Sequence, residues 1–178
     1  MSSSRLVPVA PERFDGWLAR FEAANPDGPQ RIIAIERFDH SPLAVILIRR
    51  GGYAVALTDG ARLSAHKVGT RHVQSRTAAG GWSQQRFARR RANQADELVR
   101  AVRDHAARIL GGVTCRALVV GGDRSLVAEV LEDPRLGGVA DLPRRELYDL
   151  ADPNRAVLDA ALERARAVWV RVEDAAIS

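Results

Sequence analysis

Apolar positions in the first third of the chain follow a helical spacing and then gather into short runs. Phe14, Trp17 and Phe21 recur at steps of three and four, which predicts an amphipathic helix over residues 11–24. Apolar runs bounded by turn residues then predict three strands, at residues 31–38, 44–49 and 53–58. Gly51-Gly52 predicts a tight hairpin between the last two strands.

The second half begins with a long predicted helix, which starts at about Arg86 and is closed by Gly111-Gly112. An apolar stripe runs along one side of it at steps of three and four, formed by Ala95, Leu98, Val102, Ala106 and Ile109. Shorter elements are expected after it: a strand at 115–120, a helix at 125–131, a strand at 146–150 and a final helix at 154–168. Residues 168–172 fit either an edge strand or a continuation of that helix.

Together these elements predict an α/β fold of the α+β sandwich type, in which helices pack on a mixed sheet. A chain of 178 residues fits one domain. We expect residues 1–10, which are rich in serine, to be a flexible N-terminus, and residues 11–178 to form a single domain.

Composition excludes several classes of protein. The chain is 46% hydrophobic and 28% charged, as in a soluble globule and unlike a disordered or fibrous protein. No window approaches the roughly 20 apolar residues of a membrane span, and residues 1–12 lack the apolar stretch of a secretory signal. One cysteine, Cys115, cannot form an internal disulfide, so we expect a cytoplasmic protein.

The positive charge is concentrated in one segment. The chain has 27 Lys+Arg against 22 Asp+Glu, a net charge of +5. Residues 71–108 contain nine arginines and three acidic residues, so this segment alone holds +6 and the remainder of the chain −1. Arginine binds phosphate through a planar fork, so the segment is typical of a surface that faces a polyanion.

The candidate chemistry lies within this segment, in a loop predicted over residues 80–85. Gly80 and Gly81 permit a backbone that enters narrow spaces. An amide such as that of Gln84 cannot act as a base, but it can orient a water and donate to a developing oxyanion. Arginines on both sides of the loop suit catalysis in which RNA supplies most of the active site. An exposed loop on a basic helix explains the same residues equally well.

Other chemistries have weaker signals. Residues 81–85 resemble a serine nucleophile elbow, except that glutamine stands at the fifth position. Asp39, Asp59 and Asp123 follow predicted strands and would suit a metal-dependent nuclease, although aspartates there usually form turns. The glycines after residue 120 could hold an anion, with a tight turn the favoured alternative. The four histidines show no metal-ligand spacing, so we expect no metal and no cofactor.

At residues 80–89, Gly-Gly-Trp-Ser-Gln-Gln-Arg-Phe-Ala-Arg, the chain resembles the Gly-Gly-Gln loop and following helix of the central domain of eukaryotic and archaeal peptide release factors. The likeness covers roughly residues 62–168 and includes the apolar strand that ends at Gly121-Gly122. It is strongest for the actinobacterial form of the Vms-like release factor (VLRF-type) family. In release factors glutamine directly follows the glycines, whereas Trp82 holds that place here, so the resemblance assigns the catalytic amide to Gln84, or failing that to Gln85.

The resemblance implies hydrolysis of peptidyl-tRNA at the large ribosomal subunit, with Gln84 positioning the attacking water. Ribosomal RNA and tRNA would be the partners, held by six arginines: Arg71, Arg76, Arg86, Arg89, Arg90 and Arg91. The long helix would be a rigid stalk behind the loop. A chain of this length leaves no room for a codon-reading domain, so we expect codon-independent rescue of stalled chains.

Two other functions stay open at this point: a non-catalytic module that binds ribosomal RNA or tRNA, and a metal-dependent nuclease. The release factor hypothesis also predicts that residues 80–85 are exposed and lie away from any deep pocket, because their catalytic surroundings belong to the ribosome.

Overall fold

The computed structural model describes residues 3–70 and 82–174 and divides the chain into two compact units. The large unit comprises residues 40–161, and the small unit comprises residues 1–39 and 162–178. Mixed α/β content with helices packed on a mixed sheet confirms the predicted fold class. The single domain over residues 11–178 stays a prediction; the structure divides into two packing units, and the small one takes in the N-terminal residues.

A five-stranded mixed sheet in the order β5-β4-β3-β6-β7 forms the large unit. Its strands are β3 (Leu43–Arg49), β4 (Gly52–Asp59), β5 (Arg62–Thr70), β6 (Ala117–Gly122) and β7 (Arg144–Leu147). β3, β4 and β5 form antiparallel hairpins, whereas β6 runs parallel to both β3 and β7. β3 and β6 read as nearly continuous apolar runs because both of their faces are buried.

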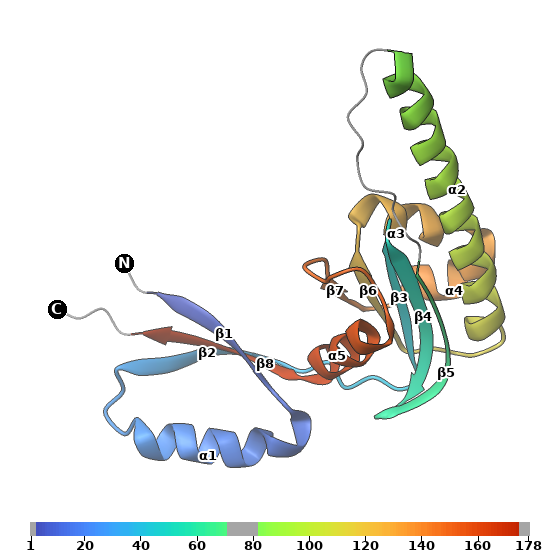
Figure 1. Ribbon diagram of the computed structural model, residues 1–178. Helices are drawn as coiled ribbons and strands as arrows, with labels where there is room; N and C mark the ends of the chain where they lie inside the picture. Colours follow the sequence, from blue (N-terminus) through green and yellow to red (C-terminus); the bar gives the residue numbers. More distant parts are fainter. Residues whose placement is uncertain (1–2, 71–81, 175–178) are drawn as a thin grey trace. The chain divides into compact units, whose positions relative to one another are not determined.

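Helices cover this sheet on both faces (Figure 1). The large unit contains α2 (Trp82–Leu110), α3 (Arg124–Leu131), the short turns η2 (Pro134–Leu136) and α4 (Gly137–Ala140), and most of α5 (Arg155–Arg166). α2 and α3 pack on the face formed by Ile46, Val55 and Val120, whose side chains share one apolar cluster with Leu98 and Val130. The core therefore lies between the sheet and the C-terminal part of α2.

The small unit is a three-stranded antiparallel sheet in the order β1-β8-β2 with one helix packed on it. Its elements are β1 (Ser4–Val9), η1 (Pro11–Arg13), α1 (Phe14–Ala24), β2 (Gln30–Glu36) and β8 (Val168–Asp174). Phe14 of α1 is buried against Val168, Val170 and Val172, and Trp17 packs at the edge of this cluster. The predicted amphipathic helix is confirmed, with a 3-10 turn at its start.

Several predicted boundaries agree with the structure, and three predictions are wrong. Residues 4–9 are not loose: Val7 and Val9 alternate with exposed neighbours and pair with β8. β8 is the central strand of its sheet and not an edge strand, because β1 and β2, more than 130 residues earlier in the chain, pair with its two sides. α2 begins at Trp82, four residues before the predicted start.

Candidate functional site

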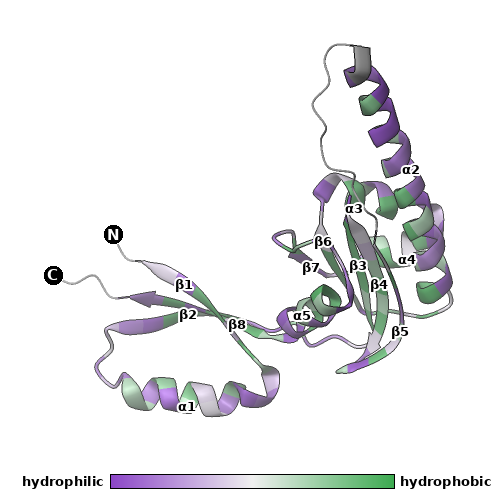
Figure 2. Ribbon diagram, in the orientation of Figure 1, coloured by the Kyte–Doolittle hydropathy of each residue, from purple (hydrophilic) through white to green (hydrophobic). Residues whose placement is uncertain are grey.

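The N-terminal part of α2 extends past the sheet that supports the rest of the helix. The helix has 29 residues, a length of about 43 Å at 1.5 Å per residue. Residues 84–94 are all exposed, Ala95 is partly buried, and Leu98 is the first fully buried residue. Figure 2 shows the same division, with hydrophilic colouring over the projecting turns and apolar positions over the supported ones. Gln84 thus lies about 21 Å along the helix from its first core anchor.

The supported part of α2 is held by apolar packing and by ion pairs. Leu98, Val102 and Ala106 are buried in the cluster beneath the helix, which confirms the predicted stripe. Arg135 of η2 pairs with Asp104 of α2 at 2.9 Å and with the buried Asp133 at 2.7 Å. The Arg135 guanidinium lowers the pKa of Asp133 to about 2. This part of the helix is therefore a firm base for the projecting turns.

Both candidate glutamines lie in the first turn of α2 and not in an irregular loop. The predicted loop reached residue 85, but the helix includes residues 82–85, a stretch without glycine or proline to interrupt it. Gln84 and Gln85 are exposed, as expected. Gly80, Gly81, Arg71 and Arg76 lie outside the described residues, so their assignments stay predictions.

Helical geometry gives the two glutamines different directions. Residues three, four or seven apart share a face, so Gln84 lies above Arg91 and Leu98 on the line that becomes the buried stripe. Gln85 is turned by about 100° and shares its face with Arg89. A target that one amide reaches is therefore not reached by the other in the same orientation of the helix.

We call residues 84–91 the α2 tip; all its charge is positive. Residues 71–94 contain six arginines and no acidic residue, and four of the six lie on the tip: Arg86, Arg89, Arg90 and Arg91. These four are exposed, and the described part of the structure contains no ion pair to any of them. Five arginines elsewhere in the large unit pair with carboxylates: Arg49 with Asp152, Arg103 with Glu132, Arg124 with Glu146, Arg135 with Asp104, and Arg155 with Asp159.

This distribution of charge works against the stability of α2. A helix N-terminus has a partial positive charge and is stabilised by acidic residues, yet the first turn of α2 has none. Arg86 and Arg90, four residues apart, repel each other on one face. A surface that is unfavourable for the isolated protein and rich in unpaired guanidinium groups is suited to an external polyanion, whose phosphates would relieve both costs.

Two of the three aspartates considered for a nuclease, Asp59 and Asp123, have structural roles in the described residues. Asp123 caps α3: its Oδ1 accepts hydrogen bonds from the Ser125 hydroxyl and from the backbone N–H of Ser125 and of Leu126. The bond from the hydroxyl is the main cause that lowers the pKa of Asp123, and the backbone bonds add to it. The Asp123 carboxylate occupies the backbone amides at the start of α3 that a bound anion would need. The glycines after residue 120 are therefore interpreted as a tight turn and not as an anion site. Asp59 accepts a hydrogen bond from the Ser41 hydroxyl at 2.7 Å. No three acidic, histidine or cysteine side chains of the described residues are grouped to hold a metal.

Two histidines of the large unit lie against its helices. His66 contacts the guanidinium of Arg155, with 3.1 Å between the nitrogens. His105 stacks on Tyr53, with ring centroids 5.5 Å apart, and partial burial together with Arg108 lowers its pKa. The His105 ring is thus engaged by the Tyr53 ring and by the Arg108 guanidinium, which lies 2.7 Å from its Nδ1.

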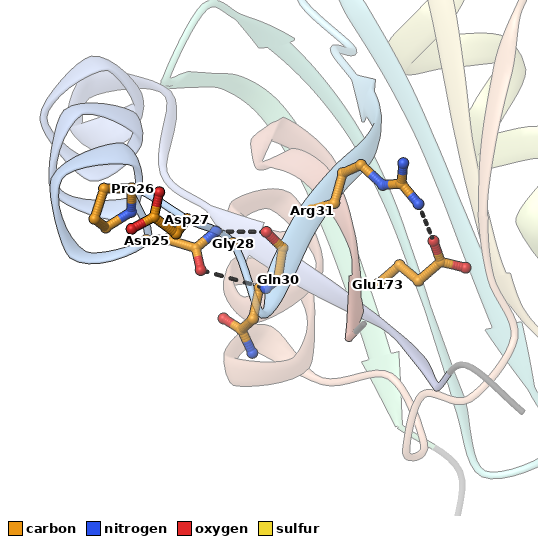
Figure 3. Close-up of a pocket in the computed structure, with 7 residues that line it drawn as sticks. All are labelled: Asn25, Pro26, Asp27, Gly28, Gln30, Arg31 and Glu173. Carbon is orange, nitrogen blue, oxygen red and sulfur yellow. Dashed lines mark hydrogen bonds and ion pairs between the residues drawn. The ribbon is translucent and has the colours of Figure 1, made fainter. Parts of the chain in front are cut away.

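Two cavities formed by described residues have linings that do not include the tip. One of about 380 Å³ is in the small unit, where Asn25 bridges the turn to β2 and Arg31 pairs with Glu173 at 3.3 Å (Figure 3). Another of about 240 Å³ lies at the opposite end of α2, between Gly112 and Val139. Neither is lined by Gln84 or Gln85. Gln84 and Gln85 are exposed and outside these two cavities, which suits a site completed by another molecule.

Residues 41–171 match the protein family described as Actinobacteria/chloroflexi VLRF1 release factor. The chain belongs to this family. The match starts beside the first residue of the large unit, contains all of α2, and ends within β8. Membership in the VLRF1 family confirms the resemblance, supports a release factor role and implies interaction with the ribosome. Comparison with curated proteins finds no match. Among the described helices none is long and apolar enough to cross a membrane.

Proposed function

We propose that this VLRF1 family member is a codon-independent peptidyl-tRNA hydrolase that frees stalled nascent chains from the large ribosomal subunit in the cytoplasm, as part of ribosome-associated quality control. The observation that supports it best is the α2 tip: an exposed glutamine on a helix, surrounded by arginines that have no carboxylate partner among the described residues. Family membership supports the release factor role itself.

In the proposed reaction a water attacks the ester carbonyl that joins the nascent chain to the tRNA ribose. The carbonyl oxygen becomes an oxyanion, the ester C–O bond then breaks, and the ribose hydroxyl leaves with the proton that the water gives up. Gln84 has an amide oxygen that accepts a hydrogen bond from this water and an N–H that donates to the oxyanion. Because an amide does not titrate, the proton passes through groups of the RNA and not through Gln84.

The arginines bind rather than react. Arg86, Arg89, Arg90 and Arg91, together with Arg71 and Arg76, would hold phosphates of ribosomal RNA and tRNA. Their positions around the circumference of the helix allow contacts on several sides, as in a narrow channel of RNA. The packing of α2 from Leu98 onward would keep Gln84 at a constant distance from the body of the protein.

The test uses isolated large ribosomal subunits that hold peptidyl-tRNA, which contain no decoding site. We expect the wild-type chain to release peptide from them, because the proposed reaction needs no codon. Gln84→Ala should lower the release rate by about 10²- to 10³-fold, the usual effect of removing one transition-state donor, with binding nearly unchanged. Asn93→Ala, which removes an exposed amide from the same helix below the tip, is the matched control.

Each alternative has its own outcome. A wild-type chain that binds the subunits and never releases peptide would be a non-catalytic RNA-binding module. Cleavage of RNA that EDTA suppresses would identify a nuclease. Loss of release in Gln85→Ala and not in Gln84→Ala would transfer the catalytic role to the other amide.

A further inference from the structure

Phe87 has an unusual position for a large aromatic residue. It lies in the second turn of α2 and is 44% exposed. The apolar cluster beneath the helix starts at Ala95, two turns further on, and does not include Phe87 among its described members. Among the described residues the ring is therefore not a member of the apolar core that anchors α2.

The position of Phe87 on the helix relates it to the proposed catalytic amide. It follows Gln84 by three residues, so the two side chains project on the same side of α2 with a rise of about 4.5 Å between them. Arg91 follows Phe87 by four residues and extends the same column. An amide, an aromatic ring and a guanidinium thus succeed one another along one face of the tip.

We propose that Phe87 stacks on an unpaired nucleobase of the RNA that the tip contacts, an inference that rests on the proposed function. The surrounding charge decides the class of partner, because the tip has four arginines and no acidic residue. A membrane surface would need a broad apolar face, whereas Phe87 is the one large apolar side chain among residues 84–94. Unpaired bases offer a flat π face for the ring and a neighbouring phosphate for Arg91.

Two RNAs could supply that base. One is the single-stranded end of the tRNA, which bears the ester and must lie beside Gln84 during the reaction. The other is ribosomal RNA lining the cavity that the tip enters. Both offer the same stacking chemistry, and the experiment below distinguishes them.

The experiment measures the affinity of the full chain for large subunits holding peptidyl-tRNA, together with the rate of release at saturation. Stacking of one base on an aromatic ring corresponds to roughly a 5- to 150-fold change in affinity. We expect Phe87→Ala and Phe87→Leu to weaken binding within that range, and Phe87→Trp to restore it. Ile33→Ala, which removes an exposed apolar side chain from the small unit, should bind as wild type. Thermal unfolding of the Phe87 variants should match that of the wild type, because Phe87 is not among the described members of the core.

A photoreactive benzoylphenylalanine at position 87 identifies the source of the base. A cross-link to tRNA assigns the base to the ester-bearing end, and a cross-link to ribosomal RNA assigns it to the cavity wall. Wild-type affinity in Phe87→Leu would overturn the proposal, since an alkyl side chain cannot stack, and so would cross-links to ribosomal protein alone. If the wild type released no peptide while the Phe87 variants still lost affinity, the hydrolase function would fail and the stacking would stand.

Discussion

Ala92 offers a direct test of whether the projecting part of α2 has to be helical. Its side chain is exposed, and it lies between the tip and the first core anchor at Leu98. Proline at this position removes the hydrogen bond to the carbonyl of residue 88 and clashes with that carbonyl. The ten helical residues before it cannot hold a helix alone, because isolated helices shorter than about 12–15 residues are marginal in water.

The magnitude follows from helix propensities if the bound tip must be helical. Relative to alanine, glycine costs about 1 kcal/mol and proline about 3 kcal/mol in a helix interior. These costs predict a release efficiency, kcat/KM, that is lower by roughly 5-fold in Ala92→Gly and by roughly 150-fold in Ala92→Pro. Ala92→Leu should be close to wild type, since leucine is a good helix former and the position is exposed.

Global stability should hardly change in this series. Residues 84–94 are exposed, so the projecting turns can fray without disturbing the packing of Leu98 and Val102. Free energies of unfolding within about 0.5 kcal/mol of wild type, together with faster amide exchange confined to residues before position 92, would show that the effect is local. Full release activity in Ala92→Pro would refute the rigid-stalk argument, and so would an activity loss accompanied by global unfolding.

Two further predictions concern charge. Each phosphate contact contributes roughly 0.7–0.9 to the slope of log affinity against log salt concentration. Arg89→Gln should therefore reduce the slope for large-subunit binding by about that amount, whereas Arg20→Gln on α1 should leave the slope unchanged. Equal slopes for both variants would disprove the phosphate contact. The pKa of Asp133, about 2 in the folded protein against its ordinary value near 4, means that its contribution to stability is complete above pH 4 and is lost as the pH falls toward 2. Asp133→Asn should therefore lower the free energy of unfolding by about 1–3 kcal/mol at neutral pH and flatten its acid dependence in denaturant titrations, whereas Asp96→Asn should do neither.

Local pattern was enough to predict most elements of the large unit. Apolar runs and glycine turns placed β3, β4 and α3 within two residues of their observed bounds, because these elements depend on neighbouring residues. The arginine segment and the glutamines were also visible in the sequence, since charge and motif are properties of the chain itself. The predicted stripe of α2 matches the buried side of the helix, because helical periodicity does not require a known partner.

What the tertiary structure decided is which surfaces find a partner. Residues 4–9 become a strand only because β8, more than 150 residues later, provides the backbone groups with which they pair. The helix face that carries the stripe continues in the sequence through Ala88 to Gln84. Only the position of the sheet shows that burial of this face stops near Ala95. Periodicity describes one helix or strand at a time, whereas burial depends on the other elements that pack against it. The length of the projecting tip therefore became known only from the folded chain. The same holds for the finding that its arginines have no ion pair within the described residues.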